Sequence, residues 1–187
     1  AKNAQTVTIG YTQFPINIDP ADEYNGWFTI RYGVGETLFK MNDQLEPEPW
    51  LAEKMEQTSQ LEWKITLRND VTFQNGEKMT GAKVESSLKR LIEKSKRAAA
   101  DLGIESIHSK GQTVTIKTKS EQPIMKNLLA EPYSVIVDVD GKSASDKAPV
   151  GTGPFLIKTY TPETGATLEA YSNYWGGKAK VAQVQIK

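Results

Sequence analysis

Residues 63–77 read Trp63-Lys64-Ile65-Thr66-Leu67-Arg68-Asn69-Asp70-Val71-Thr72-Phe73-Gln74-Asn75-Gly76-Glu77. Apolar and polar residues alternate over the first six positions, which is typical of a half-buried β-strand. Val71 and Phe73 continue the alternation after a turn expected at Asn69-Asp70. Asn75-Gly76 is a dipeptide strongly favoured in tight turns. We therefore expect an interrupted strand that ends in a tight turn.

A helix is predicted directly after this turn, from Thr80 to about Lys94. The Thr80 hydroxyl can accept a hydrogen bond from a free backbone N–H group of the first helical turn. Apolar side chains recur with the helical period on one face, and charged side chains occupy the other. The apolar positions are Val84, Leu88, Leu91 and Ile92, and the charged positions are Lys83, Glu85, Lys89 and Glu93.

Strand patterns dominate the rest of the chain. Short strands are predicted at residues 5–11, 104–108, 113–118, 135–139, 155–160, 167–171 and 181–186. Pro49 and Pro123 suit the first position of short helices that reach Met55 and Leu129. Residues 27–39 suit either a strand or a buried helix, of which we favour the helix, and residues 141–147 are expected to form a loop. This pattern predicts a mixed α+β fold rather than a regular alternation of strands and helices.

Composition narrows the classes of function. The 187 residues carry 23 basic and 23 acidic side chains and a net charge of zero, which argues against a nucleic-acid partner. No apolar run approaches the length that spans a bilayer. The chain has no cysteine and a single histidine, His108, so a bound transition metal would have to bring most of its own ligands. The polar start indicates either a cytosolic protein or one whose leader has been removed.

Few residues suggest catalysis. Gly33-Val34-Gly35 and Gly151-Thr152-Gly153 lack the third glycine of a dinucleotide loop and the lysine of a P-loop, so backbone geometry is the favoured explanation. His108 beside a predicted turn is the one candidate base of a hydrolase, and no nucleophile-elbow pattern accompanies it. Trp27 could be a core residue or wall a ligand site. Arg97, after the predicted helix, could be solvated at the helix end or could bind an anion.

Three ordered motifs carry a resemblance to a known family. They are Pro49-Trp50-Leu51-Ala52-Glu53 with the stretch from Trp63 to Glu77 and its helix, Pro149-Val150-Gly151-Thr152-Gly153-Pro154-Phe155, and Asn173-Tyr174-Trp175-Gly176-Gly177-Lys178. Together they resemble family 5 of the bacterial solute-binding proteins, which includes the oligopeptide, dipeptide and nickel receptors of ABC importers. The resemblance implies a type II periplasmic-binding-protein-like lobe, with only its amino-terminal portion in this chain. Residues 46–148 would form a compact inserted subdomain, and residues 1–45 and 149–187 part of the first ligand-binding lobe. The second lobe would be absent.

Within this family the chain is most similar to the nickel-binding branch. The resemblance implies ligand-binding roles for Trp27, Phe28, Arg97, Ala100 and Tyr133. Trp27 and Ala100 stand where the branch carries a methionine and a tryptophan. The implied ligand is a nickel chelate or a short peptide, with no cofactor and no catalytic residue. The implied partner is a membrane permease, and the implied protein is an extracytoplasmic monomer, periplasmic or lipid-anchored.

Two other classes of function stay open at the level of sequence. A hydrolase would use His108, and a pH–rate profile on esters and peptides would reveal it. A purely structural or chaperone-like surface protein needs no ligand. A ligand-induced rise in melting temperature would argue against that class.

Overall fold

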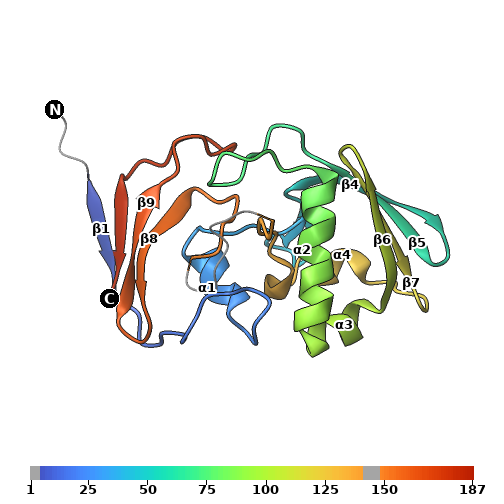
Figure 1. Cartoon of the computed structure of the whole chain (residues 1–187), viewed down its shortest axis with the longest axis horizontal. Coiled ribbons are helices and arrows are strands. Elements are labelled where there is room, and N and C mark those ends of the chain that lie inside the picture. The colour runs from blue at the N-terminus through green and yellow to red at the C-terminus, as the bar shows by residue number, and fades with distance from the viewer. Residues whose placement is uncertain (1–4, 141–147) are drawn as a thin grey trace.

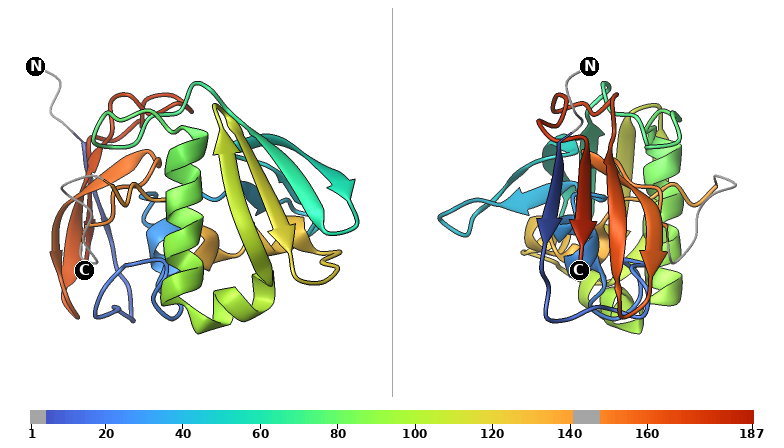
Figure 2. Two further views of the ribbon diagram at one scale, coloured as in Figure 1. Left: turned by 45° about the vertical axis from the view of Figure 1, so that its right-hand side comes forward. Right: turned by 90° about the vertical axis from the view of Figure 1, so that its left-hand side faces the viewer.

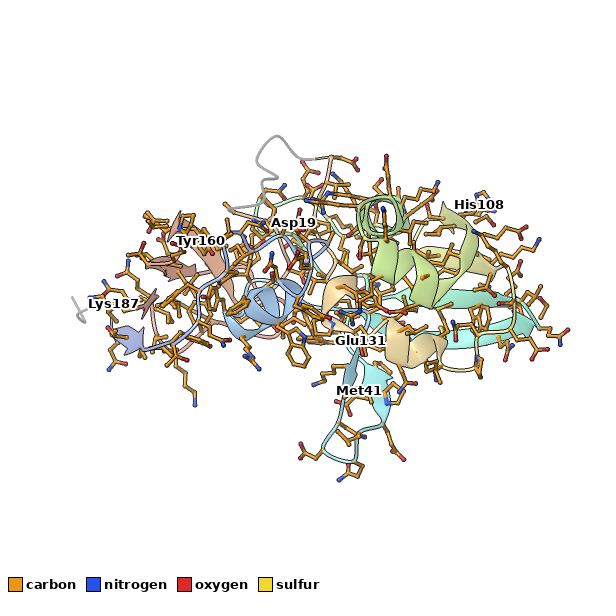
Figure 3. The ribbon with its side chains drawn as sticks, turned by 90° about the horizontal axis from the view of Figure 1, so that it is seen from below. Asp19, Met41, His108, Glu131, Tyr160 and Lys187 are labelled. Carbon is orange, nitrogen blue, oxygen red and sulfur yellow. The ribbon has the colours of Figure 1, made fainter. Side chains whose placement is uncertain are left out.

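The computed structural model describes residues 5–140 and 148–187. Two four-stranded sheets lie at opposite ends of the long axis, and the helices α1 and α2 lie between them (Figure 1). A two-stranded ribbon, β2 (Phe39–Met41) and β3 (Pro47–Pro49), projects from the same molecule (Figure 3). Within the described residues, no helix is both long and apolar enough to cross a membrane.

The first sheet joins the two ends of the chain. Its strand order is β1-β10-β9-β8, with β1 parallel to β10 and the other pairs antiparallel. The right-hand view of Figure 2 shows these strands side by side. The strands predicted near residues 5–11, 155–160, 167–171 and 181–186 are thereby confirmed. Their bounds are Thr6–Ile9 for β1, Phe155–Thr161 for β8, Gly165–Ala170 for β9 and Gln183–Ile186 for β10.

The second sheet and α2 enclose the larger apolar core. Its order is β4-β5-β7-β6, all antiparallel. The bounds are Ala52–Ser59 for β4, Glu62–Leu67 for β5, Ile104–Lys110 for β6 and Thr113–Thr118 for β7. The helix α2 (Gly81–Lys94) begins after Thr80, whose hydroxyl accepts a hydrogen bond from the Lys83 N–H. Its buried apolar residues Val84, Leu88 and Leu91 face this core, and each contributes about 1.5–3 kcal/mol relative to exposure.

Two of the predicted helices differ from the structure. Residues 49–55 are not helical, because β3 pairs with β2 and β4 pairs with β5, so tertiary pairing outweighs local preference. The helix expected within residues 27–39 is limited to α1 (Gly26–Arg31). It ends because Gly33 takes a positive φ of 70° and the chain turns back, with the Gly35 N–H bonded to the Thr29 carbonyl.

The region after Phe73 also departs from the predicted strands. Gly76 has a positive φ of 87° and its N–H bonds the Phe73 carbonyl, so the tight turn is confirmed, but pairing there is limited to one bridge between Thr72 and Lys78. Residues 135–139 form no strand. The Ile136, Val137 and Asp138 N–H groups bond three separate parts of the chain: the Glu36 carbonyl, the Ser87 hydroxyl and the Val150 carbonyl. The loop predicted at residues 141–147 lies outside the described residues.

Three short helices complete the fold. The helix α4 (Met125–Leu128) lies within the predicted segment from Pro123 to Leu129. The helix α3 (Lys96–Leu102) was not predicted, and it is followed later by a 3-10 turn, η1 (Pro132–Ser134). Ser95 ends α2 and begins α3, because its backbone is extended and its hydroxyl accepts a hydrogen bond from the Ala98 N–H.

The two glycine pairs noted in the sequence form one backbone contact. A Cβ atom on Gly151 would lie 2.1 Å from the Val34 carbonyl oxygen, and one on Gly153 would lie 2.2 Å from that of Gly33. The Gln74 amide also bonds the carbonyls of Val34 and Phe155, at 3.1 and 2.7 Å. Only glycine permits such an approach, so the backbone interpretation of these motifs is confirmed.

Glu36 joins the same region to the third sequence motif. Its buried carboxylate accepts hydrogen bonds from the Thr152 hydroxyl (2.8 Å), the Tyr174 hydroxyl (2.7 Å) and the Trp175 indole N–H (2.8 Å). Burial raises the pKa of Glu36, and these hydrogen bonds oppose that rise. Motifs far apart in the sequence therefore meet at one buried acid.

Candidate functional site

Three of the five predicted ligand residues line one hollow. Trp27 comes from α1, Arg97 from α3 and Tyr133 from η1, although up to 106 positions of sequence separate them. The remaining lining residues are Glu23, Tyr24, Glu131 and Pro132. Glu131 lies near the middle of the face seen in Figure 3, between Tyr160 and His108 toward the two ends. The tertiary fold thus gathers the aromatic and basic candidates at one place.

The other two predicted residues lie outside the lining of this hollow. Phe28 packs into the smaller apolar core, with its ring centroid 6.1 Å from that of Tyr32. Ala100 is exposed on α3, one helical turn after Arg97. Their roles in ligand binding remain predictions.

Arg97 is held between two aromatic rings. Its guanidinium carbon lies 5.0 Å from the centroid of Tyr24 and 5.0 Å from that of Tyr133. Such cation–π contacts fix the plane of a guanidinium without using its N–H donors. The Arg97 side chain is 43% exposed, so it is accessible from solvent.

Two carboxylates approach the same guanidinium without forming a tight pair. Nη2 of Arg97 lies 3.4 Å from Oε2 of Glu131, and Nε lies 3.7 Å from Oδ2 of Asp101. Neither contact is the two-point fork in which arginine pairs most strongly. The Tyr133 hydroxyl donates to Asp101 at 3.4 Å. Burial raises the pKa of Tyr133, and the charges of Asp101 and Glu131 raise it further, so this hydroxyl stays protonated.

Close backbone packing brings α1 against η1. A Cβ atom on Gly26 would lie 2.1 Å from the Pro132 carbonyl oxygen, so the first residue of α1 has to be glycine for this contact. Trp27, the second residue of α1, therefore lines the same hollow as Tyr133. Trp27 is 47% exposed, and the Arg31 guanidinium carbon lies 5.3 Å from its ring centroid.

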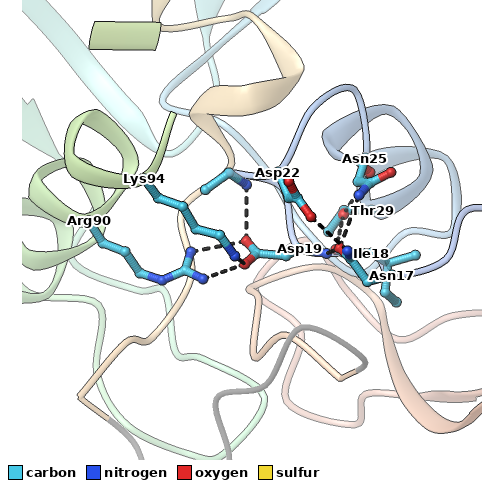
Figure 4. A network of polar contacts seen from close by, with 9 residues as sticks. Asn17, Ile18, Asp19, Asp22, Asn25, Thr29, Arg90 and Lys94 are labelled. Carbon is cyan, nitrogen blue, oxygen red and sulfur yellow. Dashed lines mark hydrogen bonds and ion pairs between the residues drawn. The ribbon is translucent and has the colours of Figure 1, made fainter. Parts of the chain in front are cut away.

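A buried aspartate anchors the segment that leads into α1 (Figure 4). Asp19 pairs with Arg90 and with Lys94, whose Nζ lies 2.5 Å from Oδ2, and it accepts a hydrogen bond from the Ala21 N–H. Burial alone would raise the pKa of Asp19, but the hydrogen bonds from Arg90 and Lys94 outweigh it and lower the pKa overall. These contacts attach the segment bearing Tyr24 and Trp27 to α2, the helix that leads into Arg97.

Sequence reasoning missed Glu23, Tyr24 and Glu131. Tyr24 stands three positions before Trp27, and Glu131 directly precedes Pro132-Tyr133, so closeness to predicted residues was the only available signal. His108 lies on an exposed position of β6, away from this hollow (Figure 3). Within residues 5–140 and 148–187, no three histidine, cysteine or acidic side chains are placed to hold a metal ion.

The hollow is shallow: its roughly 160 Å³ includes open solvent and leaves no room for a water molecule. Pockets that bury a whole small ligand usually measure about 300–1,000 Å³. A larger hollow of about 300 Å³ lies on the first sheet and is lined by residues such as Thr159, Thr167 and Gln185, but it contains no aromatic or charged cluster like the one at Arg97. The chemistry of the smaller hollow suits one side of a ligand.

Comparison with known proteins gives consistent results. Residues 46–187 match the family model of bacterial extracellular solute-binding proteins, family 5. The nickel-binding protein NikA of Staphylococcus aureus is 37% identical over 172 residues, which cover 92% of this chain and 35% of that protein. The nickel-binding periplasmic protein of Escherichia coli is 23% identical over 92% of this chain and 36% of its own length. The chain thus spans about a third of the length of these relatives.

Solved structures agree with the sequence comparison. The crystal structure of Staphylococcus aureus NikA in complex with Ni(L-His)2 superposes with a TM-score of 0.92 at 36% identity, over 97% of this chain and 38% of that one. The nickel ABC transporter structure from Bacillus halodurans gives 0.91 at 33% identity, over the same shares of the two chains. The predicted mixed α+β, type II binding-protein fold, present in part, is therefore confirmed.

Proposed function

The chain belongs to the family 5 bacterial extracellular solute-binding proteins, and on that premise we propose that it supplies one side of the ligand site of an ABC importer receptor for a nickel chelate. The observation that carries the proposal is the Arg97 guanidinium held between Tyr24 and Tyr133, with Trp27 beside it. A chelator that bears carboxylates can bind the guanidinium through charge-assisted hydrogen bonds while its flat parts pack on the aromatic rings.

The size of the hollow fits a divided site. Because it leaves no room for even a water molecule, it can contact one face of a chelate but cannot enclose it. Closure of two lobes around a ligand would supply the remaining contacts. The chain spans only 35% of the Staphylococcus aureus relative, which leaves ample length for a second lobe in a protein of that size.

The division of the chain is part of the proposal. Residues 1–45 and 149–187 would form part of the first ligand-binding lobe, and residues 46–148 an inserted subdomain. Pairing of both chain ends in the sheet β1-β10-β9-β8 supports this division. The β2–β3 ribbon crosses the boundary at residue 46, so the two parts would be closely connected.

The family also suggests a location and partners for the protein. Its members are extracellular or periplasmic, so we place the protein outside the cytoplasm. Anchoring by a lipid, docking to a membrane permease and a monomeric state belong to the proposal. A receptor of this kind captures and releases its ligand, so it would act without catalysis.

A peptide receptor is the second candidate. The dipeptide-binding protein DppE of Bacillus subtilis is 24% identical over 86% of this chain. Peptide receptors hold backbone and chain termini, and Arg97 could bind a terminal carboxylate. The higher identity to nickel-binding relatives favours the chelate.

Calorimetry on the full-length protein distinguishes these candidates. We expect Ni(II) with excess L-histidine to bind with a dissociation constant below about 1 μM, corresponding to about −8 kcal/mol. Ni(II) without a chelator and a panel of dipeptides should bind much more weakly. Tight binding of dipeptides, with no measurable binding of the nickel complex, would indicate a peptide receptor instead.

A further inference from the structure

Carboxylates lie near the one guanidinium that lines the hollow. Glu23 and Glu131 line it, and Asp101 contacts Arg97 at 3.7 Å from the neighbouring turn of α3. The side chain of Glu131 is 42% exposed, so it is accessible from solvent. A ligand that reaches Arg97 therefore meets the negative charge of Glu131 and Asp101 next to the guanidinium.

The long contact between Arg97 and Glu131 leaves hydrogen-bonding positions on both side chains for a ligand. At 3.4 Å between Nη2 and Oε2, a single hydrogen bond joins them, whereas a guanidinium has five N–H donors and a carboxylate about four acceptor positions. The stacking on Tyr24 and Tyr133 holds the guanidinium plane in place independently of Glu131. A ligand can therefore bind Arg97 and Glu131 at the same time.

We propose that Glu131 determines the class of chelator that this site accepts, an inference that rests on the proposed function. A ligand carboxylate placed on Arg97 lies next to the Glu131 carboxylate, and like charges at that distance repel. The repulsion is removed when the ligand carries an amine or another N–H donor near its carboxylate, because that donor binds Glu131. The site accordingly selects amino-carboxylate chelators over chelators that carry only carboxylates.

The test compares two nickel complexes on the full-length protein. The probes are Ni(II) with excess L-histidine, which offers amines beside carboxylates, and Ni(II) with excess citrate, which offers carboxylates and a hydroxyl group. Calorimetry is run on the wild type and on Glu131→Gln, a substitution that keeps the shape and removes the charge. We expect the substitution to weaken the histidine complex and strengthen the citrate complex, so that the ratio of the two affinities changes by about tenfold or more.

A matched control separates this effect from a change of net charge. Glu105 is another exposed carboxylate, 50% exposed on β6 and paired with Lys117 at 2.8 Å. Glu105→Gln changes net charge equally and should leave the ratio unchanged. Asp101→Asn, which removes the second carboxylate near Arg97, should shift the ratio in the same direction as Glu131→Gln and serves if that variant folds poorly.

The outcomes are distinguishable. If the wild type binds the histidine complex but neither Glu131→Gln nor Asp101→Asn alters the ratio, the role of Glu131 is refuted and the proposed function stands. If the wild type binds neither nickel complex, the proposed function fails, and the inference fails with it.

Discussion

Replacing Arg97 by alanine should weaken chelate binding by at least tenfold while leaving the fold intact. The guanidinium is the sole positive group that lines the hollow within the described residues. Losing a charge-assisted contact to a partly buried ligand charge costs about 2–5 kcal/mol. The 43% exposure of Arg97 places the expected value near the lower end, about 2 kcal/mol, which corresponds to about thirtyfold.

The same substitution should lower stability moderately and leave the protein folded. The contacts it removes inside the protein are two ion pairs at 3.4 and 3.7 Å and two cation–π contacts, all made by a side chain that is 43% exposed. Exposed ion pairs contribute about 0–1 kcal/mol each, and exposed cation–π contacts about 0.5–1 kcal/mol each, so the total is about 1–4 kcal/mol. Thermal melting should therefore show one cooperative transition at a lower midpoint, and calorimetry on the folded variant should show the loss of affinity for the nickel–histidine complex.

Two further variants test whether the effect is specific to the Arg97 guanidinium. Lys96→Ala removes an exposed neighbouring charge on α3 and should leave affinity nearly unchanged. Arg97→Lys keeps the charge but loses the planar fork, so it should recover only part of the affinity. Equal affinity of the wild type and Arg97→Ala at low salt would refute the reasoning and return Arg97 to a purely structural role.

Three further predictions concern stability and the divided site. Gly26→Ala should destabilise the chain by about 1–3 kcal/mol in denaturant unfolding, because the added Cβ atom would overlap the Pro132 carbonyl. This loss is expected although alanine normally favours helices. Gly10→Ala is the control and should be neutral, because a Cβ atom at Gly10 would have its nearest neighbour 3.9 Å away. Asp19→Asn should cost about 1–3 kcal/mol at pH 7 by leaving Arg90 and Lys94 without their charge partner. Because the pKa of Asp19 is lowered in the folded protein, its contribution to stability is complete above the unfolded pKa of about 3.9 and is lost as pH falls through the folded pKa. The wild type and Asp19→Asn should therefore converge in stability in acid. A stability difference that grows below pH 4 would contradict this. Residues 1–187 alone should bind nickel chelates and short peptides no more tightly than about micromolar, and nanomolar affinity in calorimetry would refute the two-lobe site.

Local patterns predicted much of the fold. β5, β7 and α2 were found because alternation and helical periodicity express burial on one face, and Thr80 marked the start of α2. The helix expected at Pro49 was wrong because β4 takes its hydrogen bonds from β5, a partner that no local pattern reveals. The helix α3 was missed because Ser95 interrupts the periodicity after Lys94.

The candidate site was predictable only in part. Resemblance suggested Trp27, Arg97 and Tyr133, and the fold brings these three together. It could not supply Tyr24 or Glu131, whose closeness to Arg97 depends on how α1, α3 and η1 pack. Phe28 illustrates the same limit, because adjacent residues on a helix face different directions, and Phe28 packs toward Tyr32 in the core.

A crystal structure of the full-length protein with its nickel complex would test the central claim most directly. Anomalous scattering at the nickel edge locates the metal independently of the surrounding density. The account predicts nickel beside the hollow formed by Tyr24, Trp27, Arg97 and Tyr133, with a chelator carboxylate on the Arg97 guanidinium at about 2.7–2.9 Å. Nickel bound elsewhere, with Arg97 still paired only with Glu131 and Asp101, would contradict it.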